Sequence, residues 1–556
     1  MRIDGEGLPG GAVYVSMEPA GGGGFIPVSL GRFRISGAIQ KTTSRVVMNI
    51  KKAFTYLYLT AGLLAVVAGC TLNEPYRRNL PDPDHRGVDL DCDCNRPGVT
   101  TNCFAVESNS VYGLGFVEFD DQGWFWSHQQ WSAVKEEIKA ENAATTNGMT
   151  IIVFVHGWKN NSAADNGNVQ MFRRALAKMA GTVRNRRFFG VYVGWRGLST
   201  VSDILPPGGM ELSFYERKAV AERIGHQGAA TQVFTELEVM QDEFNETKPA
   251  TRPRAELVII GHSFGGQIVY SAISQILTER LILATHKKEA KTEKTEKAED
   301  EPPPVHSLGD LVILLNPAFE ASIYENLNAL ATSGQIHYPH SQRPVLAIFT
   351  STGDWGTGAI FPIGRFFSTL FEAARQSGPG NVWETNRMNL RKNPTPGEYK
   401  AIMKTVGHDG DFINFDLKYK ELGKAPVIAP SNPTNADELW QLQLNLDDLN
   451  TTLAHNNKRQ SKHETMQPYV FTGAYTNNSK QKIDYTCTLE PRAGKTNNYS
   501  YNLRNPFLNV AVDTHIMSGH NDIENPVVLN FLREFILFAT QTNYPVAGTN
   551  GGAANK

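Results

Sequence analysis

A serine stands at a point where the pattern of the chain changes from strand to helix. The apolar run at 255–263 predicts a buried strand, and apolar residues recur at helical spacing directly after it. The junction reads Gly261-His262-Ser263-Phe264-Gly265. A serine on such a sharp turn holds its hydroxyl clear of the sheet, and glycines two residues to either side relieve crowding there. We therefore predict that Ser263 is a nucleophile; the alternative is a serine that only shapes the turn.

Candidates for an acid and a base follow this serine along the chain. A serine hydroxyl attacks weakly until a base takes its proton and a carboxylate orients that base. Asp354 in STGDWGTG and Glu320 after LLNPAF are carboxylates that follow predicted strands. His515 stands at the end of a later strand, and His520 lies in the loop before the closing helix. A turn or helix cap is the structural alternative for Asp354, and core packing is the alternative for His515.

Short apolar segments alternate with segments of helical periodicity through most of the chain. Predicted strands lie at 150–157, 188–195, 255–263, 310–318, 344–352 and 507–515; predicted helices follow the first and third strands and also lie at 235–244 and 526–539. A turn sequence within 116–126 predicts a hairpin before them. Apolar strands of this length between helices are typical of a parallel sheet covered on both faces. We therefore expect an α/β fold with a mostly parallel central sheet.

The strand, turn and nucleophile motifs together resemble those of the alpha/beta-hydrolase superfamily. The resemblance covers about 112–355 and 506–540 and is greatest to a lipase/esterase-like branch with F-V-H-G-W and G-W-R-G segments. These segments are Phe154–Trp158 and Gly194–Gly197 here. The resemblance implies an alpha/beta-hydrolase fold, a serine nucleophile, no cofactor, and the chain order nucleophile, acid, histidine.

The same resemblance selects among the candidate residues. The acid of the family commonly follows the penultimate strand and the histidine precedes the closing helix, which favours Asp354 and His520. The tetrahedral intermediate needs preorganised backbone N–H donors, and the resemblance implies those of Trp158 and Phe264. The side chains of Trp158 and His156 then line the pocket.

Arg196, in the G-W-R-G segment, has two interpretations that the sequence leaves open. It either contacts an anionic group of the substrate or forms a structural hydrogen bond to the neighbouring loop.

Two insertions interrupt the alternation of strands and helices. The charged, proline-containing segment at 285–306 has few large apolar residues, so we expect a disordered surface loop. The segment at 356–505 is too long for an ordinary connection, and we expect it to fold partly by itself as a cap or lid. The hydrolase core would then comprise 112–355 and 506–545.

The segment from Met48 to Thr71 has the layout of an export signal. Two lysines precede an apolar run that ends in Val-Ala-Gly-Cys. These last residues resemble the lipobox of bacterial lipoproteins, which implies a signal peptide at 48–69 and a lipid on Cys70. A single membrane-spanning anchor is the alternative. By the same resemblance, Thr71 implies an outer-membrane location.

The segments on either side of this signal have different expected roles. We expect 1–47 to be a mis-called start or disordered, because it shows neither helical nor strand periodicity. The segment at 70–111 is rich in proline and charge at its start and is expected to be a tether that carries a cysteine cluster.

Four cysteines remain beside Cys70: Cys92, Cys94, Cys103 and Cys487. An even number in an exported protein permits two disulfides. A bond between Cys92 and Cys94 would be strained, so we expect one of them to pair with Cys103 and another with Cys487. A zinc site at the first three is the alternative, but no further ligand stands at suitable spacing.

Composition excludes one class of function and leaves the catalytic prediction in place. The net charge of −2 gives no general attraction for nucleic acid. No metal-ligand constellation or dinucleotide fingerprint is present. We expect a serine hydrolase of carboxylic esters, with acyl lipids among its candidate substrates, held to the bacterial envelope by lipidated Cys70. The alternatives are a catalytically inactive envelope binding protein and an acyltransferase with the same three residues.

Overall fold

The computed structural model describes residues 74–80, 103–183, 186–199, 209–292, 302–333, 336, 338–339, 341–368, 404–422, 469–476, 480–492 and 504–540. All of them belong to the compact unit Gly69–Lys556. The predicted signal peptide, the segment before it, Cys70, Cys92 and Cys94 lie outside these residues. No helix within the described ranges combines the length and the apolar character needed to cross a bilayer.

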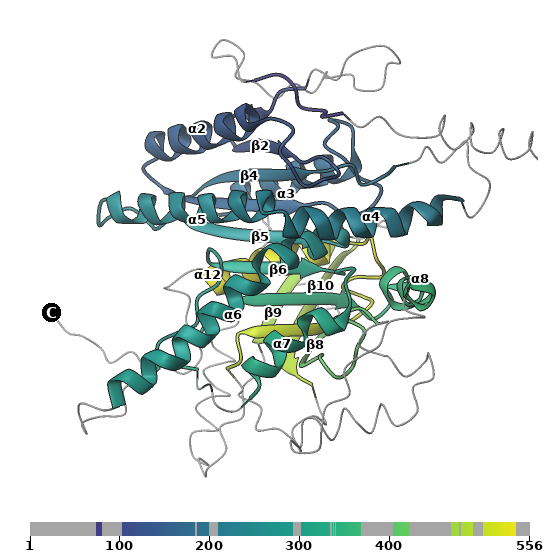
Figure 1. Cartoon of the computed structure of the whole chain (residues 1–556). Coiled ribbons are helices and arrows are strands. Elements are labelled where there is room, and N and C mark those ends of the chain that lie inside the picture. The colour runs from purple at the N-terminus through teal and green to yellow at the C-terminus, as the bar shows by residue number, and fades with distance from the viewer. Residues whose placement is uncertain are drawn as a thin grey trace, which may run out of the picture. The chain divides into compact units, whose positions relative to one another are not determined.

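One twisted sheet of eleven strands forms the centre of the described structure (Figure 1). In chain order the strands are β1 Val106–Ser108, β2 Tyr112–Glu118, β3 Gly148–Val155, β4 Arg186–Gly194, β5 Glu256–His262, β6 Leu311–Leu315, β7 Leu346–Ser351, β8 Phe415–Glu421, β9 Tyr469–Thr476, β10 Lys482–Pro491 and β11 Phe507–Val512. Their order in the sheet is β1-β2-β4-β3-β5-β6-β7-β11-β8-β10-β9. The strands from β2 to β8 in this order are parallel, whereas β1, β10 and β9 each pair antiparallel with a neighbour.

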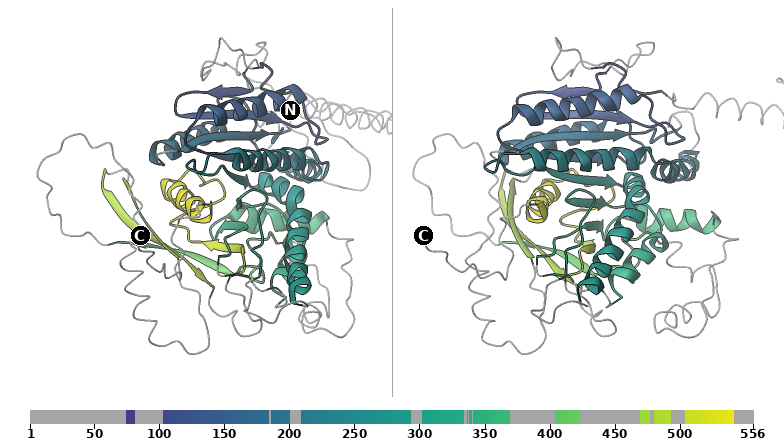
Figure 2. Two further views of the ribbon diagram at one scale, coloured as in Figure 1. Left: turned by 90° about the vertical axis from the view of Figure 1, so that its left-hand side faces the viewer. Right: turned by 60° about the vertical axis from the view of Figure 1, so that its left-hand side comes forward.

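Helices cover both faces of the sheet. They are α2 His128–Ala144, α3 Gly167–Thr182, α4 Gly209–His226, α5 Ala229–Thr247, α6 Phe264–Thr292, α7 Ala321–Ala331, the π-helix η1 Gly356–Ile360, α8 Phe361–Ser368 and α12 Pro526–Thr540. Side chains of α3 and α12 share a buried apolar cluster with one face, and those of α2 and α4 to α7 share a second cluster with the other. Figure 2 shows α12 and α6 on opposite sides of the sheet. The expected α/β class with a mostly parallel sheet is therefore confirmed.

Burial explains why the sequence predicted the central strands well. Every residue of β3, β5, β6, β7 and β11 is buried, since helices cover both faces. The expected hairpin is smaller than predicted. Phe119 and Phe125 form an isolated antiparallel bridge across a turn, while the residues before Phe119 form β2, which pairs with β1 and β4.

The expected tether at 70–111 is wrong for its described parts. Arg77 is 3% exposed and is held by Glu107 and by the carbonyl oxygen of Ser162. Asn79 bridges Phe104 next to the strand β1, which belongs to the sheet. A buried guanidinium is stable only when carboxylates and carbonyls satisfy it, and these partners fix the segment to the core.

The charged segment at 285–306 also differs from the expectation. Helix α6 continues through the first eight residues of this segment and ends at Thr292. The types of most of these eight residues are compatible with a helix. Near the other end, Val305 is 4% exposed and exchanges two hydrogen bonds with the side chain of Gln342. The centre of the segment lies outside the described residues.

The described parts of 356–505 extend the central sheet and do not form a separate cap. After η1 and α8, β8 pairs with β11, β10 pairs with β8, and β9 pairs with β10. Alternate residues of β10 face the apolar cluster beneath α12, as the alternating burial of this strand shows. This amphipathic alternation is the pattern of a half-covered strand.

The expected disulfide of Cys487 is wrong. Cys487 is a free, buried thiol on β10, and burial raises its pKa to about 12. Its side chain packs in the apolar cluster under α12 as a small hydrophobic group. Cys103 does form a disulfide. Its partner lies outside the described residues, since Cys487 is free.

Candidate active site

Ser263 occupies a strained turn between β5 and α6. Its φ of 57° lies in the left-handed region, which a side chain with a Cβ adopts at a cost. Its backbone N–H donates to the carbonyl oxygen of Leu315 at 3.0 Å. A Cβ on Gly265 would lie 2.0 Å from the carbonyl oxygen of Val155, and a Cβ on Gly261 would lie 2.7 Å from that of Gly265. Both glycines are therefore required by close backbone contacts around the turn.

The structure brings Ser263, His520 and Asp354 together in one hydrogen-bonded chain. Ser263 Oγ lies 2.8 Å from His520 Nε2, and His520 Nδ1 lies 2.8 Å from Asp354 Oδ2. These residues follow β5, β11 and β7, whose carboxyl ends meet at one edge of the parallel sheet. In this arrangement the serine hydroxyl can donate to Nε2 while Nδ1–H donates to the carboxylate. The histidine is thus placed to take the serine proton.

Asp354 is held in its charged form by hydrogen bonds. Its side chain is fully buried, and Thr357 donates to it from the backbone N–H at 3.1 Å and from the hydroxyl at 2.5 Å. Burial alone would raise the pKa of Asp354, but the bonds from His520 and Thr357 outweigh burial and lower it. The carboxylate therefore remains an acceptor for His520 well below neutral pH.

The Thr357 hydroxyl also adjoins a further histidine. His408 Nδ1 lies 3.4 Å from Thr357 Oγ1 and 3.1 Å from Thr405 Oγ1. Burial lowers the pKa of His408, which favours the neutral ring at this position. His408 therefore packs against the acid loop without adding a charge beside Asp354.

Two buried side chains hold the backbone of His520 in place. Asn316 donates from Nδ2 to the carbonyl oxygens of His520 at 2.9 Å and Gly519 at 3.2 Å, and its Oδ1 accepts the N–H of Ser351 at 2.9 Å. His262 Nε2 lies 2.9 Å from the same carbonyl oxygen of His520. The ends of β5, β6 and β7 are thereby connected to the loop that carries His520.

His262 performs this role as a neutral ring. Burial, with a smaller effect of His520, lowers the pKa of His262 to about 3. Nε2 must carry the proton because its partner is a carbonyl oxygen, which only accepts. The neutral ring of His262 therefore donates its Nε2–H to the carbonyl oxygen of His520.

The expected oxyanion donors are the backbone N–H groups of Trp158 and Phe264. The hydrogen bonds of the described residues include none from these two groups. Phe264 is the first residue of α6, where helical geometry leaves N–H groups without partners. A Cβ on Gly157 would lie 2.6 Å from Ser263 Cβ, so the segment that leads to Trp158 contacts the serine directly.

The G-W-R-G segment supports the loop that carries Trp158. Lys159, at φ 67°, donates to the carbonyl oxygen of Gly197 at 2.9 Å, and Gly197 donates to that of Asn160 at 3.0 Å. His156 does not line a pocket as expected. It is fully buried, stacks on Trp195, and accepts the N–H of Trp195 at Nε2, while burial lowers its pKa to about 4.

An aromatic cluster adjoins the serine turn. Phe214 of α4 packs with ring centroids 4.9 Å from Phe264, 5.4 Å from Trp158 and 6.1 Å from Phe361. The Nε1 of Trp158 is buried and has no hydrogen-bond partner among the described residues. Aromatic rings therefore pack on the side of the turn that faces α4.

The alternative residues lie apart from the serine. Glu320 forms ion pairs with Lys218 at 3.0 Å and Arg365 at 2.6 Å. His515 pairs with Asp513, and its side chain is 72% exposed, so the structure does not bury it.

Arg196 has the structural role that the sequence left open. It forms an ion pair with Asp121, which also pairs with Arg217 at 2.8 Å. These partners join the loop after β4 to the turn after β2.

Sequence reasoning missed Asn316 and Thr357. Each follows a strand end and is next to or near a predicted acid, in LLNPAF and GDWGTG. A polar residue directly after a buried strand was the available signal for Asn316. Its φ of 43° and full burial could not be inferred from one sequence.

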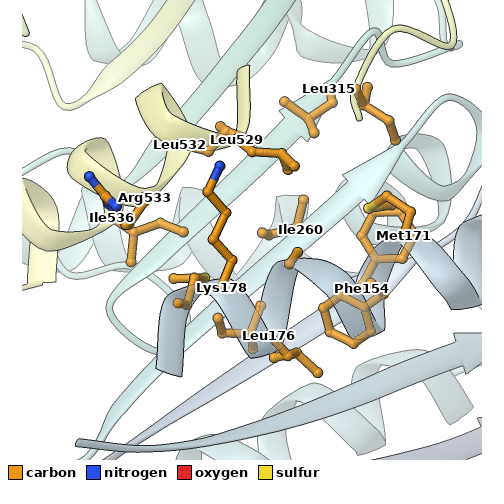
Figure 3. A pocket seen from close by; sticks show the side chains of 15 residues that line it. Phe154, Met171, Leu176, Lys178, Ile260, Leu315, Leu529, Leu532, Arg533 and Ile536 are labelled. Atoms are coloured by element: carbon orange, nitrogen blue, oxygen red, sulfur yellow. The ribbon is translucent and has the colours of Figure 1, made fainter. Parts of the chain in front are cut away.

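One enclosed cavity among the described residues is separate from this site. It measures about 60 Å³ and lies between α3, α12 and the sheet (Figure 3). Its lining includes Leu176, Ile260 and Leu532, and Lys178 reaches across it from α3, but none of the three hydrogen-bonded residues lines it. Across the described ranges, no group of three histidine, cysteine or acidic side chains is arranged to hold a metal.

Comparison of the chain with protein-family models, curated proteins and solved structures finds no match. Function therefore has to be inferred from the geometry of the site and the motifs of the sequence.

Proposed function

We propose that this protein is a serine hydrolase of the alpha/beta-hydrolase superfamily that cleaves carboxylic esters. The observation that carries the proposal is the chain Ser263 Oγ, His520, Asp354, with both contacts at 2.8 Å. Three groups in this order activate a hydroxyl that is otherwise a weak nucleophile.

The proposed reaction proceeds through an acyl-enzyme. Ser263 Oγ attacks the ester carbonyl carbon while its proton moves to His520 Nε2. The oxyanion accepts hydrogen bonds from the N–H groups of Trp158 and Phe264. His520 then protonates the leaving alkoxide as the C–O bond breaks. A water molecule then attacks the acyl-enzyme while its proton moves to His520 Nε2. His520 returns this proton to Ser263 Oγ as the carboxylic acid is released.

The order of the strands supports the assignment to this superfamily. The serine, acid and histidine follow β5, β7 and β11, so that their chain order is nucleophile, acid, histidine. The serine has the left-handed φ of a strand-to-helix nucleophile turn. The strands β8, β10 and β9 extend the sheet beyond β11, with β6 and β7 between β11 and the strand that leads to Ser263.

The apolar cluster favours an acyl substrate. The rings of Phe214, Trp158 and Phe361 pack beside the turn that carries Ser263 and offer aromatic surface to an acyl chain. Burial of each methylene group contributes about 0.8 kcal/mol. We further propose, from the lipobox-like sequence, that Cys70 carries a lipid that anchors the enzyme to the bacterial envelope.

Ester turnover by the full chain tests the proposal. We expect hydrolysis of p-nitrophenyl butanoate with release of butanoate. The Ser263→Ala variant should lose this activity. Ser274→Ala replaces a serine within α6, away from the site, and should retain it. Absence of turnover by the folded wild-type protein would contradict the proposal. Consumption of ester only when an alcohol acceptor is present would reassign the protein as an acyltransferase.

A further inference from the structure

Three large apolar side chains are strongly exposed around the edge of the sheet that carries the site. Trp355, Trp124 and Ile363 are 69%, 66% and 62% exposed, the largest values among large hydrophobic residues of the described ranges. Trp124 follows β2, whereas Trp355 and Ile363 follow β7. Because parallel strands end at the same edge, all three lie at the edge where Ser263 follows β5.

These side chains lie on both sides of the serine. Three strand spacings of about 4.8 Å separate β2 from β5, or about 14 Å, and two spacings separate β5 from β7, or about 10 Å. The turn that carries Trp124 is rigid, since Asp120 accepts its N–H at 2.9 Å and donates to its carbonyl oxygen at 3.0 Å. Figure 1 shows α8, which carries Ile363, projecting beyond the sheet.

The segment nearest to the proposed lipid attachment is fixed to this same edge. The N–H groups of Tyr76 and Arg77 donate to the carboxylate of Glu118, the last residue of β2, at 3.0 and 2.8 Å. Arg77 Nε donates to the carbonyl oxygen of Ser162 at 2.8 Å, and Asn161 donates to the Tyr76 hydroxyl at 3.2 Å. Ser162 and Asn161 belong to the loop after β3 that also carries Trp158.

The chain between Cys70 and this fixed segment is short. Arg77 follows Cys70 by 77 − 70 = 7 residues, which span at most about 25 Å when fully extended. A lipid on Cys70 would therefore keep the edge that carries Ser263 close to the bilayer surface. The two exposed tryptophans are of the type that is favoured at membrane interfaces.

We propose that this edge docks on the surface of the membrane that holds the Cys70 lipid, and that the substrate is an ester of a lipid in that same membrane. The proposal rests on the proposed function for its chemistry and on the exposed side chains and the short connection for its geometry. Trp124, Trp355 and Ile363 are the docking side chains. Ser263 lies between them, where a lipid ester raised from the bilayer surface would reach it.

Two activities of the full chain, measured in parallel, test this proposal. One substrate is soluble p-nitrophenyl butanoate, and the other is a fluorogenic phospholipid in vesicles of phosphatidylethanolamine and phosphatidylglycerol that also hold the protein. In the double variant Trp124→Ala/Trp355→Ala, we expect phospholipid hydrolysis to fall by about tenfold or more, since each exposed ring loses its apolar contact with the membrane. Hydrolysis of the soluble ester should remain unchanged.

Val239→Ala is the matched control, because Val239 is 50% exposed on α5 and does not belong to this edge. It should leave both activities unchanged. A second variant lengthens the connection by a flexible glycine and serine linker after Thr71. It should lower phospholipid hydrolysis alone, because a longer linker lowers the effective concentration of the edge at the membrane.

The outcomes separate this proposal from the proposed function. If the folded wild-type protein hydrolyses neither the soluble ester nor the phospholipid, the hydrolase assignment itself is contradicted. Hydrolysis of the soluble ester without hydrolysis of the phospholipid would overturn the membrane-substrate proposal alone. An unchanged ratio of the two activities in the double tryptophan variant would also overturn it.

Discussion

The loop that follows β11 takes part in two histidine–aspartate pairs that have the same contact distance and different surroundings. His520 Nδ1 lies 2.8 Å from Asp354, and His515 Nδ1 lies 2.8 Å from Asp513. Hydrogen bonds lower the pKa of both carboxylates against the opposing effect of burial. Neither the distance nor the direction of the pKa shift therefore distinguishes the two pairs.

Burial and the third partner do distinguish them. The side chain of Asp354 is 0% exposed and that of Asp513 is 32% exposed, while those of His520 and His515 are 24% and 72% exposed. The second nitrogen of His520 lies at hydrogen-bond distance from Ser263 Oγ, whereas the ring of His515 stacks on Tyr419, a partly buried side chain of β8. A histidine–aspartate contact becomes a candidate catalytic pair only when it is buried and connected to a nucleophile.

Replacement of the two histidines should give the largest contrast. We expect His520→Ala to lower kcat for p-nitrophenyl butanoate by on the order of 10⁵-fold, because the base is lost. His515→Ala removes a mostly exposed ring and should change kcat by less than about twofold. Steady-state kinetics of the two variants measures the contrast, and equal losses would show that the comparison is wrong.

Replacement of the two carboxylates should give a smaller contrast of the same sign. Asp354→Asn retains the shape of the side chain but no longer orients or stabilises the protonated His520, so kcat should fall by about 10³- to 10⁴-fold. Asp513→Asn should leave kcat almost unchanged. If kcat is retained in Asp354→Asn, then Asp354 is not the orienting group.

The side chain that holds His520 should affect turnover more than an equally buried side chain elsewhere. Asn316→Ala removes the donors to the carbonyl oxygens of Gly519 and His520, and we expect kcat to fall on the order of tenfold with KM little changed. Asn509→Ala is the control, because Asn509 is equally buried and donates to the carbonyl oxygen of Val406.

Both of these variants should lose about 1–3 kcal/mol of the free energy of unfolding, because each leaves buried groups without partners. Only Asn316→Ala should also lower kcat. Equal kcat values in the two variants, measured with urea unfolding as the check on stability, would assign Asn316 a purely structural role.

The remaining prediction concerns the stability of the protein in mild acid. Burial lowers the pKa of His156 to about 4 and that of His262 to about 3, from an ordinary value near 6.5. The unfolded chain therefore binds more protons than the folded protein below pH 6.5, and the free energy of unfolding falls as the pH decreases toward these values. Each ring contributes up to about 1.4 kcal/mol per pH unit in this window.

Urea unfolding at several pH values between neutral and about 4.5 measures this dependence. His262→Gln keeps an N–H donor but does not titrate, so its stability should depend on pH less steeply than that of the wild-type protein. The same slope in both proteins would contradict neutral burial of His262.

The sequence predicted those parts of the molecule whose pattern is local. Continuous apolar runs marked the strands β3, β5, β6, β7 and β11, since burial on both faces requires such runs. Ser263 could be chosen because it stands between a predicted strand and a predicted helix. The resemblance to the alpha/beta-hydrolase superfamily then favoured Asp354 and His520 over Glu320 and His515, which also follow strands. The structure brings Ser263, Asp354 and His520 together, and their catalytic roles stay predictions.

Long-range partners explain what the sequence did not predict. The role of Arg77 depends on Glu107 and Ser162, which lie far from it in the chain. Strands β8 and β10 alternate polar and apolar side chains within a segment that looked too long for a connection. Only the pairing of β8 with β11, and of β10 with β8, assigns them to the sheet. Cys487 looked like half of a disulfide because pairing cannot be read from a count of cysteines.

The most direct test of the central claim is the rate at which a fluorophosphonate probe labels the full chain, with the modified peptide identified by mass spectrometry. We expect covalent labelling of Ser263 in the wild-type protein and in His515→Ala, and none in Ser263→Ala. In His520→Ala labelling should be slower by several orders of magnitude, because the serine loses its base. Labelling of another residue, or equal rates in the two histidine variants, would contradict the claim that His520 activates Ser263.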